Sequence, residues 1–215
     1  MAIEGVKKEI YKEIIAVIRV KSYNLAKMIT ETLLEAGFKG IELTMTIENG
    51  ASLIKEMKEK YPNSVIGAGT IMDAEKCLEV VKNGADFVVS PCKIKEVAEI
   101  CKEYNTLCML GIATPTEAFE AYNLGCSIVK AFPGDVLKPQ FIKDIKGPMP
   151  YIEVMPSGGV ALENIGQWFA NDAYAVSVGS ALYKGINEDN LDQLTERAKL
   201  YLEEVRKHTK IEELV

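Results

Sequence analysis

At 215 residues the chain is long enough for one large domain, and its composition, 48% hydrophobic and 26% charged, is that of an ordinary globular protein. The formal net charge of −6 argues against a nucleic acid or a membrane surface as partner, and any anionic substrate must be held by local groups. The first apolar run, residues 14–18, is too short for a signal-peptide core or a membrane span, so we expect a cytoplasmic protein.

Short β-branched runs alternate with helical patterns along the chain. The first helical stretch repeats apolar residues with a period of 3.6, as in Leu25, Met28, Ile29 and Leu33. Strands are expected to begin near Ile14, Gly40, Ser64, Ala85, Leu107, Ser127, Tyr151 and Ala173. Helix-start signals are Ser22, Asp73 and Thr114-Pro115, and helix-stop signals are Gly37, Gly84 and Gly125.

Successive strand starts lie roughly 20 to 26 residues apart, room for one strand, one helix and two short loops. Eight such units predict a single α/β domain over residues 1–215, a (β/α)8 TIM barrel with an extra N-terminal helix at residues 2–12 that closes its bottom. A doubly wound open sheet is the alternative that alternation alone does not exclude. The Gly-Ala-Gly at residues 67–69 is no dinucleotide fingerprint, because Met72 stands where the third glycine belongs.

Lys130 is the most informative single residue. It lies in an apolar run, residues 127–131, that reads as a strand buried on both faces, and a turn follows at Phe132-Pro133-Gly134. A buried ammonium group either pairs with a carboxylate or gives up its proton, and a neutral amine is a nucleophile for carbonyl compounds. The alternative is a lysine at a strand end with its head in solvent.

Two further charged residues fall in predicted apolar strands. Arg19 ends the first strand, and Glu42 lies in the second. Catalytic groups of such barrels come from the carboxyl ends of the strands, so we expect Arg19, Glu42 and Lys130 to converge. The alternative for Glu42 and Lys130 is a buried ion pair that only fixes the core. Glu153, in the seventh strand, is expected at a solvated edge instead.

Two glycine–serine loops predict a phosphate site. The seventh strand runs into Ser157-Gly158-Gly159, and the eighth runs into Gly179-Ser180. In phosphate-binding barrels these two loops hold the anion, because glycines let backbone N–H groups approach its oxygens. The alternative is that both segments are ordinary tight turns.

Histidine and cysteine usage narrows the chemistry. His208, the single histidine, lies in a charged C-terminal segment and reads as a solvated helix end, which excludes histidine-based triads and zinc sites that need several imidazoles. Carboxylate-only magnesium sites remain open. The five cysteines form no Cys-x-x-Cys pair and read as reduced, mostly buried residues.

Taken in order, the motifs resemble the 2-keto-3-deoxy-6-phosphogluconate (KDPG) and 4-hydroxy-2-oxoglutarate (KHG) aldolases, class I enzymes that use a lysine Schiff base on a (β/α)8 barrel. The resemblance covers roughly residues 14–185. It rests on Ile-Glu-Leu-Thr at 41–44, Gly-Ala-Gly-Thr at 67–70, Val-Ser-Pro at 89–91, Val-Lys-Ala-Phe-Pro at 129–133, Pro-Ser-Gly-Gly at 156–159 and Val-Gly-Ser at 178–180.

The resemblance implies a role for each matching residue. Lys130 would form the Schiff base, and Glu42 would be the general acid/base. Thr70 and Arg19 would lie near the substrate carboxylate, with Pro91 and Phe132 shaping the pocket. The phosphate would be held by Ser157, Gly158, Gly159, Gly179 and Ser180. The family also implies a homotrimer with no metal and no cofactor.

The chain departs from the family pattern at several positions. Thr46 stands where many members have an arginine that meets the pyruvate carboxylate, so Thr46 would do less there and Arg19 more. Ser157 replaces a threonine and keeps its hydroxyl. Leu110 replaces an expected proline, and Cys92 follows Pro91, so both are expected to reshape the pocket wall.

The resemblance implies cleavage of KDPG to pyruvate and glyceraldehyde 3-phosphate, with KHG, which gives pyruvate and glyoxylate, as a further substrate. Two alternatives remain from the residues themselves. A phosphosugar isomerase or epimerase would explain the glycine loops but normally needs histidines or metal ligands. A non-catalytic phospholigand-binding barrel would explain the loops but gives no reason for Lys130 and Glu42.

Overall fold

The computed structural model describes residues 1–209. Its strands are β1 (Ile14–Ile18), β2 (Gly40–Thr44), β3 (Val65–Gly69), β4 (Phe87–Val89), β5 (Leu107–Met109), β6 (Gly111–Ile112), β7 (Ile128–Ala131), β8 (Glu153–Pro156) and β9 (Val176–Val178). Its helices are α1 (Ile3–Ile10), α2 (Tyr23–Ala36), α3 (Gly50–Lys60), α4 (Ala74–Lys82), α5 (Lys95–Glu103), α6 (Pro115–Asn123), α7 (Gly134–Leu137), α8 (Gln140–Lys146), α9 (Ile165–Ala170), α10 (Ser180–Tyr183) and α11 (Leu191–Thr209). Each predicted strand start lies within a few residues of an observed one.

The helix boundaries follow from the capping residues that the sequence predicted. The side chains of Ser22, Asp73 and Thr114 accept hydrogen bonds from the backbone N–H groups of the first turns of α2, α4 and α6. Gly37 ends α2 in the left-handed conformation, with a φ of 107°. These local signals explain why the chain turns where it does between strands.

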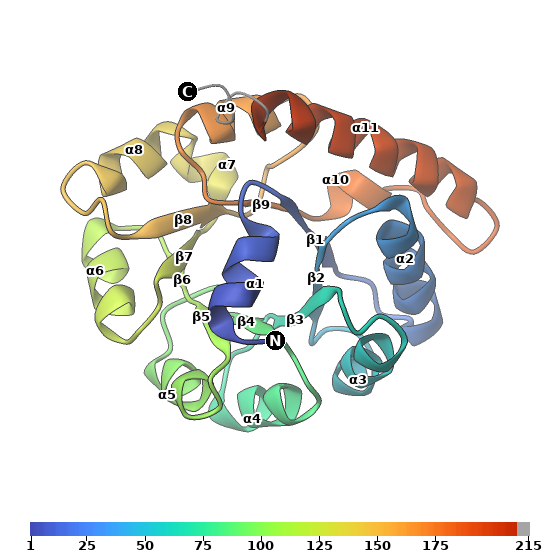
Figure 1. Ribbon diagram of the computed structural model, residues 1–215, viewed down its shortest axis with the longest axis horizontal. Coiled ribbons are helices and arrows are strands. Elements are labelled where there is room, and N and C mark those ends of the chain that lie inside the picture. Colours follow the sequence, from blue (N-terminus) through green and yellow to red (C-terminus); the bar gives the residue numbers. More distant parts are fainter. Residues whose placement is uncertain (210–215) are drawn as a thin grey trace.

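All strand pairings are parallel, and they form a curled sheet with the helices after β1 outside it, whereas α1 lies across its centre (Figure 1). One sheet has the order β5-β4-β3-β2-β1-β9, and the other has the order β6-β7-β8. The fifth predicted strand is interrupted at Leu110, whose carbonyl accepts the N–H of Lys130 at 2.9 Å. A further parallel bridge joins Ser157, after β8, to Ser177 in β9. The fold is therefore α/β with a curled parallel sheet.

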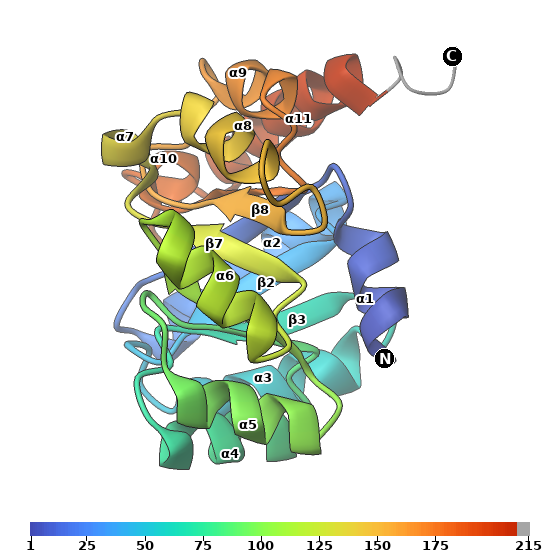
Figure 2. The same cartoon turned by 90° about the vertical axis from the view of Figure 1, so that its left-hand side faces the viewer.

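The apolar residues form two clusters. The larger lies between the outer face of the sheet and the helices. The smaller fills the inside of the sheet, where Ile15, Phe87 and Met155 pack with Val6 and Ile10 of α1. In Figure 2, α1 lies at one end of the strands, and α7 and α10 lie at the opposite end. The amino ends of the strands are thus covered by α1, and the carboxyl ends remain available for a site.

Several minor expectations can be compared with the described residues. All five cysteines are free, and all but Cys92 are buried, as predicted. Glu153 is half-buried at the start of β8, where it accepts a hydrogen bond from Lys146 at 2.8 Å. His208 lies near the end of α11 beside Glu204, at 3.1 Å. None of the helices within residues 1–209 has the length and apolar character needed to cross a bilayer.

Candidate active site

Lys130 and Glu42 meet inside the curled sheet. Lys130 lies in β7 with 3% of its surface exposed, and Glu42 lies in β2 with none exposed. Lys130 Nζ is 3.9 Å from Glu42 Oε1. Both carboxylate oxygens of Glu42 are buried and have no hydrogen-bond partner within the described part of the chain. The two residues therefore lie together, as predicted. Their contact is long, and the carboxylate lacks the hydrogen bonds of a fully paired ion pair.

Glycines on neighbouring strands make the space for this pair. Glu42 is in register with Gly67 of β3, and Lys130 is in register with Gly111 of β6. A Cβ atom at Gly69 would overlap the Glu42 carboxylate, and a Cβ atom at Gly111 would overlap the Pro91 backbone. Since only glycine lacks that atom, the sequence of β3 is what lets Glu42 lie inside the sheet.

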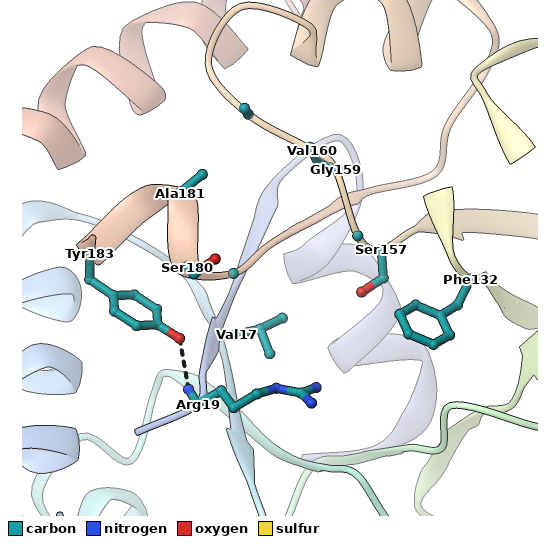
Figure 3. Close-up of a pocket in the computed structure, with 12 residues that line it drawn as sticks. Val17, Arg19, Phe132, Ser157, Gly159, Val160, Ser180, Ala181 and Tyr183 are labelled. Carbon is teal, nitrogen blue, oxygen red and sulfur yellow. Dashed lines mark hydrogen bonds between the residues drawn. The ribbon is translucent and has the colours of Figure 1, made fainter. Parts of the chain in front are cut away.

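A cavity of about 360 Å³ opens beside this pair at the carboxyl ends of β1, β7, β8 and β9 (Figure 3). Its lining residues are Val17, Arg19, Phe132, Ser157, Gly158, Gly159, Val160, Ala161, Gly179, Ser180, Ala181 and Tyr183. All five residues predicted to hold a phosphate are among them. Gly158 and Gly159 have φ values of 87° and 69°, a backbone conformation that glycine adopts without strain.

Arg19 supplies the positive charge of the cavity. It is the one ionised lining residue among those the structure describes, and Figure 3 shows its side chain extending across the cavity from the end of β1. The glycine loops contribute only neutral groups, so an anion in this cavity would be neutralised by Arg19. The acidic chain can therefore attract an anion locally in spite of its net charge of −6.

Tyr183 is a lining residue that sequence reasoning missed. It lies in α10, three residues after Ser180, and its hydroxyl oxygen accepts the backbone N–H of Arg19 at 2.9 Å (Figure 3). Burial raises the pKa of the Tyr183 phenol, and the negative charge of Glu42 adds to this, against the lowering effects of the Arg19 N–H and guanidinium. A pocket tyrosine could have been suspected from its place just after the second glycine–serine loop.

Thr70 and Thr46, predicted at the carboxylate end of the substrate, do not line this cavity. Thr70 directly follows β3 and has a φ of 61°, which is strained for a β-branched residue. Thr46 is exposed. Thr44 donates its one proton to the Ile18 carbonyl at 2.9 Å, so in the 2.8 Å contact between the two threonine hydroxyls Thr46 is the donor. Thr46 thus has no proton left for a carboxylate.

The remaining predicted positions differ in how they contribute. Phe132 lines the cavity, and its ring centroid is 5.4 Å from Lys130 Nζ. Pro91 follows β4 and is packed against Gly111, outside the cavity lining. Leu110 is fully buried and packs in the outer cluster, and Cys92 is exposed. Neither Leu110 nor Cys92 forms part of the cavity wall that the sequence led us to expect them to reshape.

No group of three or more metal-ligating side chains is found within residues 1–209. A buried amine next to an unpartnered carboxylate, near a cavity lined by an arginine and two glycine loops, is typical of enzymes that form a Schiff base with an anionic carbonyl compound.

Comparison with known proteins gives the family. Residues 5–197 match the family model described as KDPG and KHG aldolase. A 2-dehydro-3-deoxy-phosphogluconate aldolase of Haemophilus influenzae is 29% identical over 185 residues, which are 85% of this chain and 87% of the relative. A 2-dehydro-3-deoxy-6-phosphogalactonate aldolase of Escherichia coli K12 is 31% identical over 173 residues, 80% of this chain and 84% of the relative. The chain belongs to the KDPG and KHG aldolase family, which confirms the resemblance found in the sequence.

A solved structure described as native KDPGal has a similar fold. It has a TM-score of 0.85 and 27% sequence identity, and the match covers 92% of this chain and 96% of the other. The similarity extends over nearly the whole of both chains, so the curled parallel sheet and its helices are shared throughout.

Proposed function

We propose that this protein is a class I aldolase that cleaves 2-keto-3-deoxy-6-phosphogluconate to pyruvate and glyceraldehyde 3-phosphate, and 4-hydroxy-2-oxoglutarate to pyruvate and glyoxylate. The observation that carries the proposal is the buried Lys130 amine, 3.9 Å from a Glu42 carboxylate with no hydrogen-bond partner among the described residues. The amine lies 5.4 Å from the ring centroid of Phe132, which lines the glycine-loop cavity. Membership of the KDPG and KHG aldolase family supports it.

In the proposed reaction, the neutral Lys130 amine attacks the C2 ketone of the substrate, and loss of water gives an iminium. Glu42, directly or through one water, removes the proton of the C4 hydroxyl. The C3–C4 bond then breaks, its electrons flow into the iminium, and the aldehyde leaves. Glu42 returns the proton to C3 of the resulting enamine, and water hydrolyses the pyruvate iminium to regenerate Lys130. The unpartnered oxygens of Glu42 suit this task because no hydrogen bond to the protein has to be broken first.

We assign the substrate phosphate to the cavity, where Ser157, Gly158, Gly159, Gly179 and Ser180 would hold it. Arg19 would neutralise it, because its side chain extends into this cavity. Thr70 would then bind the substrate carboxylate, and Pro91 and Phe132 would bound the pocket. Thr46, whose proton is engaged by Thr44, would not donate to the carboxylate.

A second substrate deserves equal testing. The phosphogalactonate epimer differs from the phosphogluconate substrate in the configuration at C4, and the Escherichia coli relative named for it is 31% identical to this chain. We therefore propose steady-state assays with both epimers and with 4-hydroxy-2-oxoglutarate side by side. The epimer with the higher kcat/KM is the physiological substrate in this proposal.

The architecture also belongs to the proposal. We infer that the strands close into one (β/α)8 barrel domain over residues 1–215, with β5 and β6 forming a single broken strand and α1 as the plug at its amino end. The Lys130 N–H to Leu110 bond and the Ser157–Ser177 bridge, at the two junctions between the sheets, support closure. A homotrimer follows from the family resemblance, and a cytoplasmic location stays a prediction.

Covalent trapping tests the function directly. Incubation with pyruvate and borohydride should add one pyruvate-derived mass to a peptide containing Lys130, because the iminium is reduced to a stable amine. Lys130→Ala should abolish both labelling and cleavage. Lys12→Ala is the matched control, because Lys12 is also buried, at 6% exposure, yet lies before β1 at the opposite end of the sheet. Label on another lysine, or none, would overturn the Schiff-base proposal and favour a non-catalytic binding barrel.

A further inference from the structure

We propose that the Tyr183 hydroxyl is a substrate-binding group of the cavity, which donates a hydrogen bond to the phosphate. This rests on the proposed function and adds a residue to it. The starting point is the hydrogen-bond capacity of a phenol, which has one proton and an oxygen that can also accept. The backbone N–H of Arg19 occupies the accepting side at 2.9 Å. Within residues 1–209, no acceptor is found for the Tyr183 proton.

The protein keeps this proton on the phenol. Tyr183 is buried to 8% exposure, and burial is the main reason that its pKa is raised. The negative charge of Glu42 raises it further, whereas the N–H and the positive charge of Arg19 oppose the rise. Val17 and Ala181, which line the same cavity, are apolar. Tyr183 is therefore a donor over the whole neutral range.

The position of the hydroxyl fits an anion. It lies at the cavity wall next to the end of β1, and Figure 3 shows it between the Arg19 backbone and the start of α10 at Ser180. Accepting the Arg19 N–H fixes the direction of the phenol and strengthens it as a donor. A hydrogen bond from a hydroxyl to an anionic oxygen is among the stronger ones that proteins form. Tyr183 and Arg19 thus place a directed donor and a positive charge in one cavity.

Tyr183 could instead serve only to attach α10 to β1. A discriminating experiment compares two substrates, because only one of them carries a phosphate. We expect Tyr183→Phe to lower kcat/KM for the phosphorylated substrate about ten- to a hundredfold, the usual loss for a hydrogen bond to a charged group. The loss for 4-hydroxy-2-oxoglutarate should be markedly smaller. An equal loss on both substrates, or no loss on either, would overturn the proposal.

Tyr174→Phe is the matched control. The Tyr174 phenol is also partly buried, with a pKa raised to about 12, mainly by burial, but it donates to the Lys7 carbonyl at 2.8 Å, near the amino ends of the strands. Its removal should leave the ratio of the two kcat/KM values unchanged. A changed ratio of the two kcat/KM values in Tyr174→Phe would mean that a general loss of rigidity alters the ratio. That result would count against a direct role for Tyr183.

The wild-type protein offers an independent measurement. In a crystal soaked with inorganic phosphate, a phosphate oxygen should lie within hydrogen-bond distance of Tyr183 Oη. A phosphate bound in the cavity beyond that distance would overturn the proposal even if Tyr183→Phe failed to fold. Failure of the proposed function is distinguished by the wild type itself, which would then not be labelled by pyruvate and borohydride on Lys130.

Discussion

Two lysine–carboxylate pairs with buried carboxylates, at opposite ends of the strands, are built in opposite ways. Near the carboxyl ends, Lys130 and Glu42 are 3.9 Å apart, and the Glu42 oxygens lack hydrogen-bond partners among the described residues. Near the amino ends, Lys58 Nζ is 2.6 Å from Asp86. Asp86 also accepts the backbone N–H of Ile66 at 2.9 Å and pairs with the N-terminal amine of Met1 at 3.3 Å.

The hydrogen-bond donors around a buried carboxylate indicate its role. A buried carboxylate saturated with donors holds its neighbours in place, and losing it leaves those donors unpaired. A buried carboxylate without donors lowers the stability of the fold, so a chemical use is the better explanation for it. On this argument we assign Asp86 a structural role and propose a catalytic one for Glu42, although both lie beside a lysine. Two predictions separate these pairs, and two more extend the comparison to the cavity and to a third carboxylate, in order of decreasing effect.

Glu42→Gln should lose activity and keep stability. The amide has the same shape but cannot take a proton, so cleavage should fall about 10² to 10⁴-fold, the usual contribution of a general acid–base group. Exchange of the pyruvate methyl protons with deuterated water, followed by NMR, reports enamine protonation without any aldehyde and should collapse as well. The thermal midpoint should not decrease. Exchange near the wild-type rate together with lost cleavage would mean that Glu42 only orients the substrate.

Asp86→Ala should lose stability and keep activity. Breaking one partner of a buried ion pair costs about 3–5 kcal/mol of unfolding free energy, and here three donors lose their acceptor. Denaturant titration should show this loss, whereas the folded fraction should keep its specific activity. Glu31→Ala removes the half-buried partner of the exposed Lys60, a pair at 2.7 Å, and should cost no more than about 1 kcal/mol. A comparable effect of the two substitutions would contradict the structural assignment of Asp86.

Gly179→Asp should separate the phosphate cavity from the catalytic pair. A Cβ atom at Gly179 has open space within 4 Å, so the substitution should fold, while its charge repels a phosphate. We expect kcat/KM for the phosphorylated substrate to fall about tenfold or more, with a much smaller change for 4-hydroxy-2-oxoglutarate. Gly159 is unsuitable, because a Cβ there would lie 2.5 Å from that of Asp135 at a φ of 69°. Parallel losses on the two substrates would indicate a folding defect.

Glu117→Gln should give the smallest effect. It tests whether a carboxylate that accepts hydrogen bonds stabilises the fold wherever it lies along the strands. The backbone N–H of Ala113, with help from the Thr114 hydroxyl, lowers the pKa of Glu117. Its stabilisation is therefore present above the unfolded-state value of about 4.3 and is lost as the pH falls through the lower folded-state value. Urea unfolding of the wild type and Glu117→Gln should differ at pH 7 and converge below about pH 4. A difference in unfolding free energy that grows as the pH falls would contradict this pH dependence.

The sequence predicted the large elements better than the details of the site. Strand starts and helix caps could be read locally, because periodicity and capping are short-range. The break at Leu110 could not, since it depends on Lys130 from the next strand donating to the Leu110 carbonyl. The meeting of Lys130 and Glu42 was predictable because both interrupt apolar strands. The Tyr183 hydroxyl was missed because its place depends on how the short helix α10 returns toward β1.

Gly69 has a consequence for how precisely Glu42 is placed. The carboxylate occupies the volume that a side chain at position 69 would fill, so it is located by confinement and not by hydrogen bonds. A group held in that way keeps all of its lone pairs for whatever enters the site. It also means that the acid can be displaced from a neighbouring strand: an alanine at position 69 would push Glu42 aside and leave a lysine that still captures ketones. The integrity of the reaction therefore depends on a residue that takes no part in its chemistry.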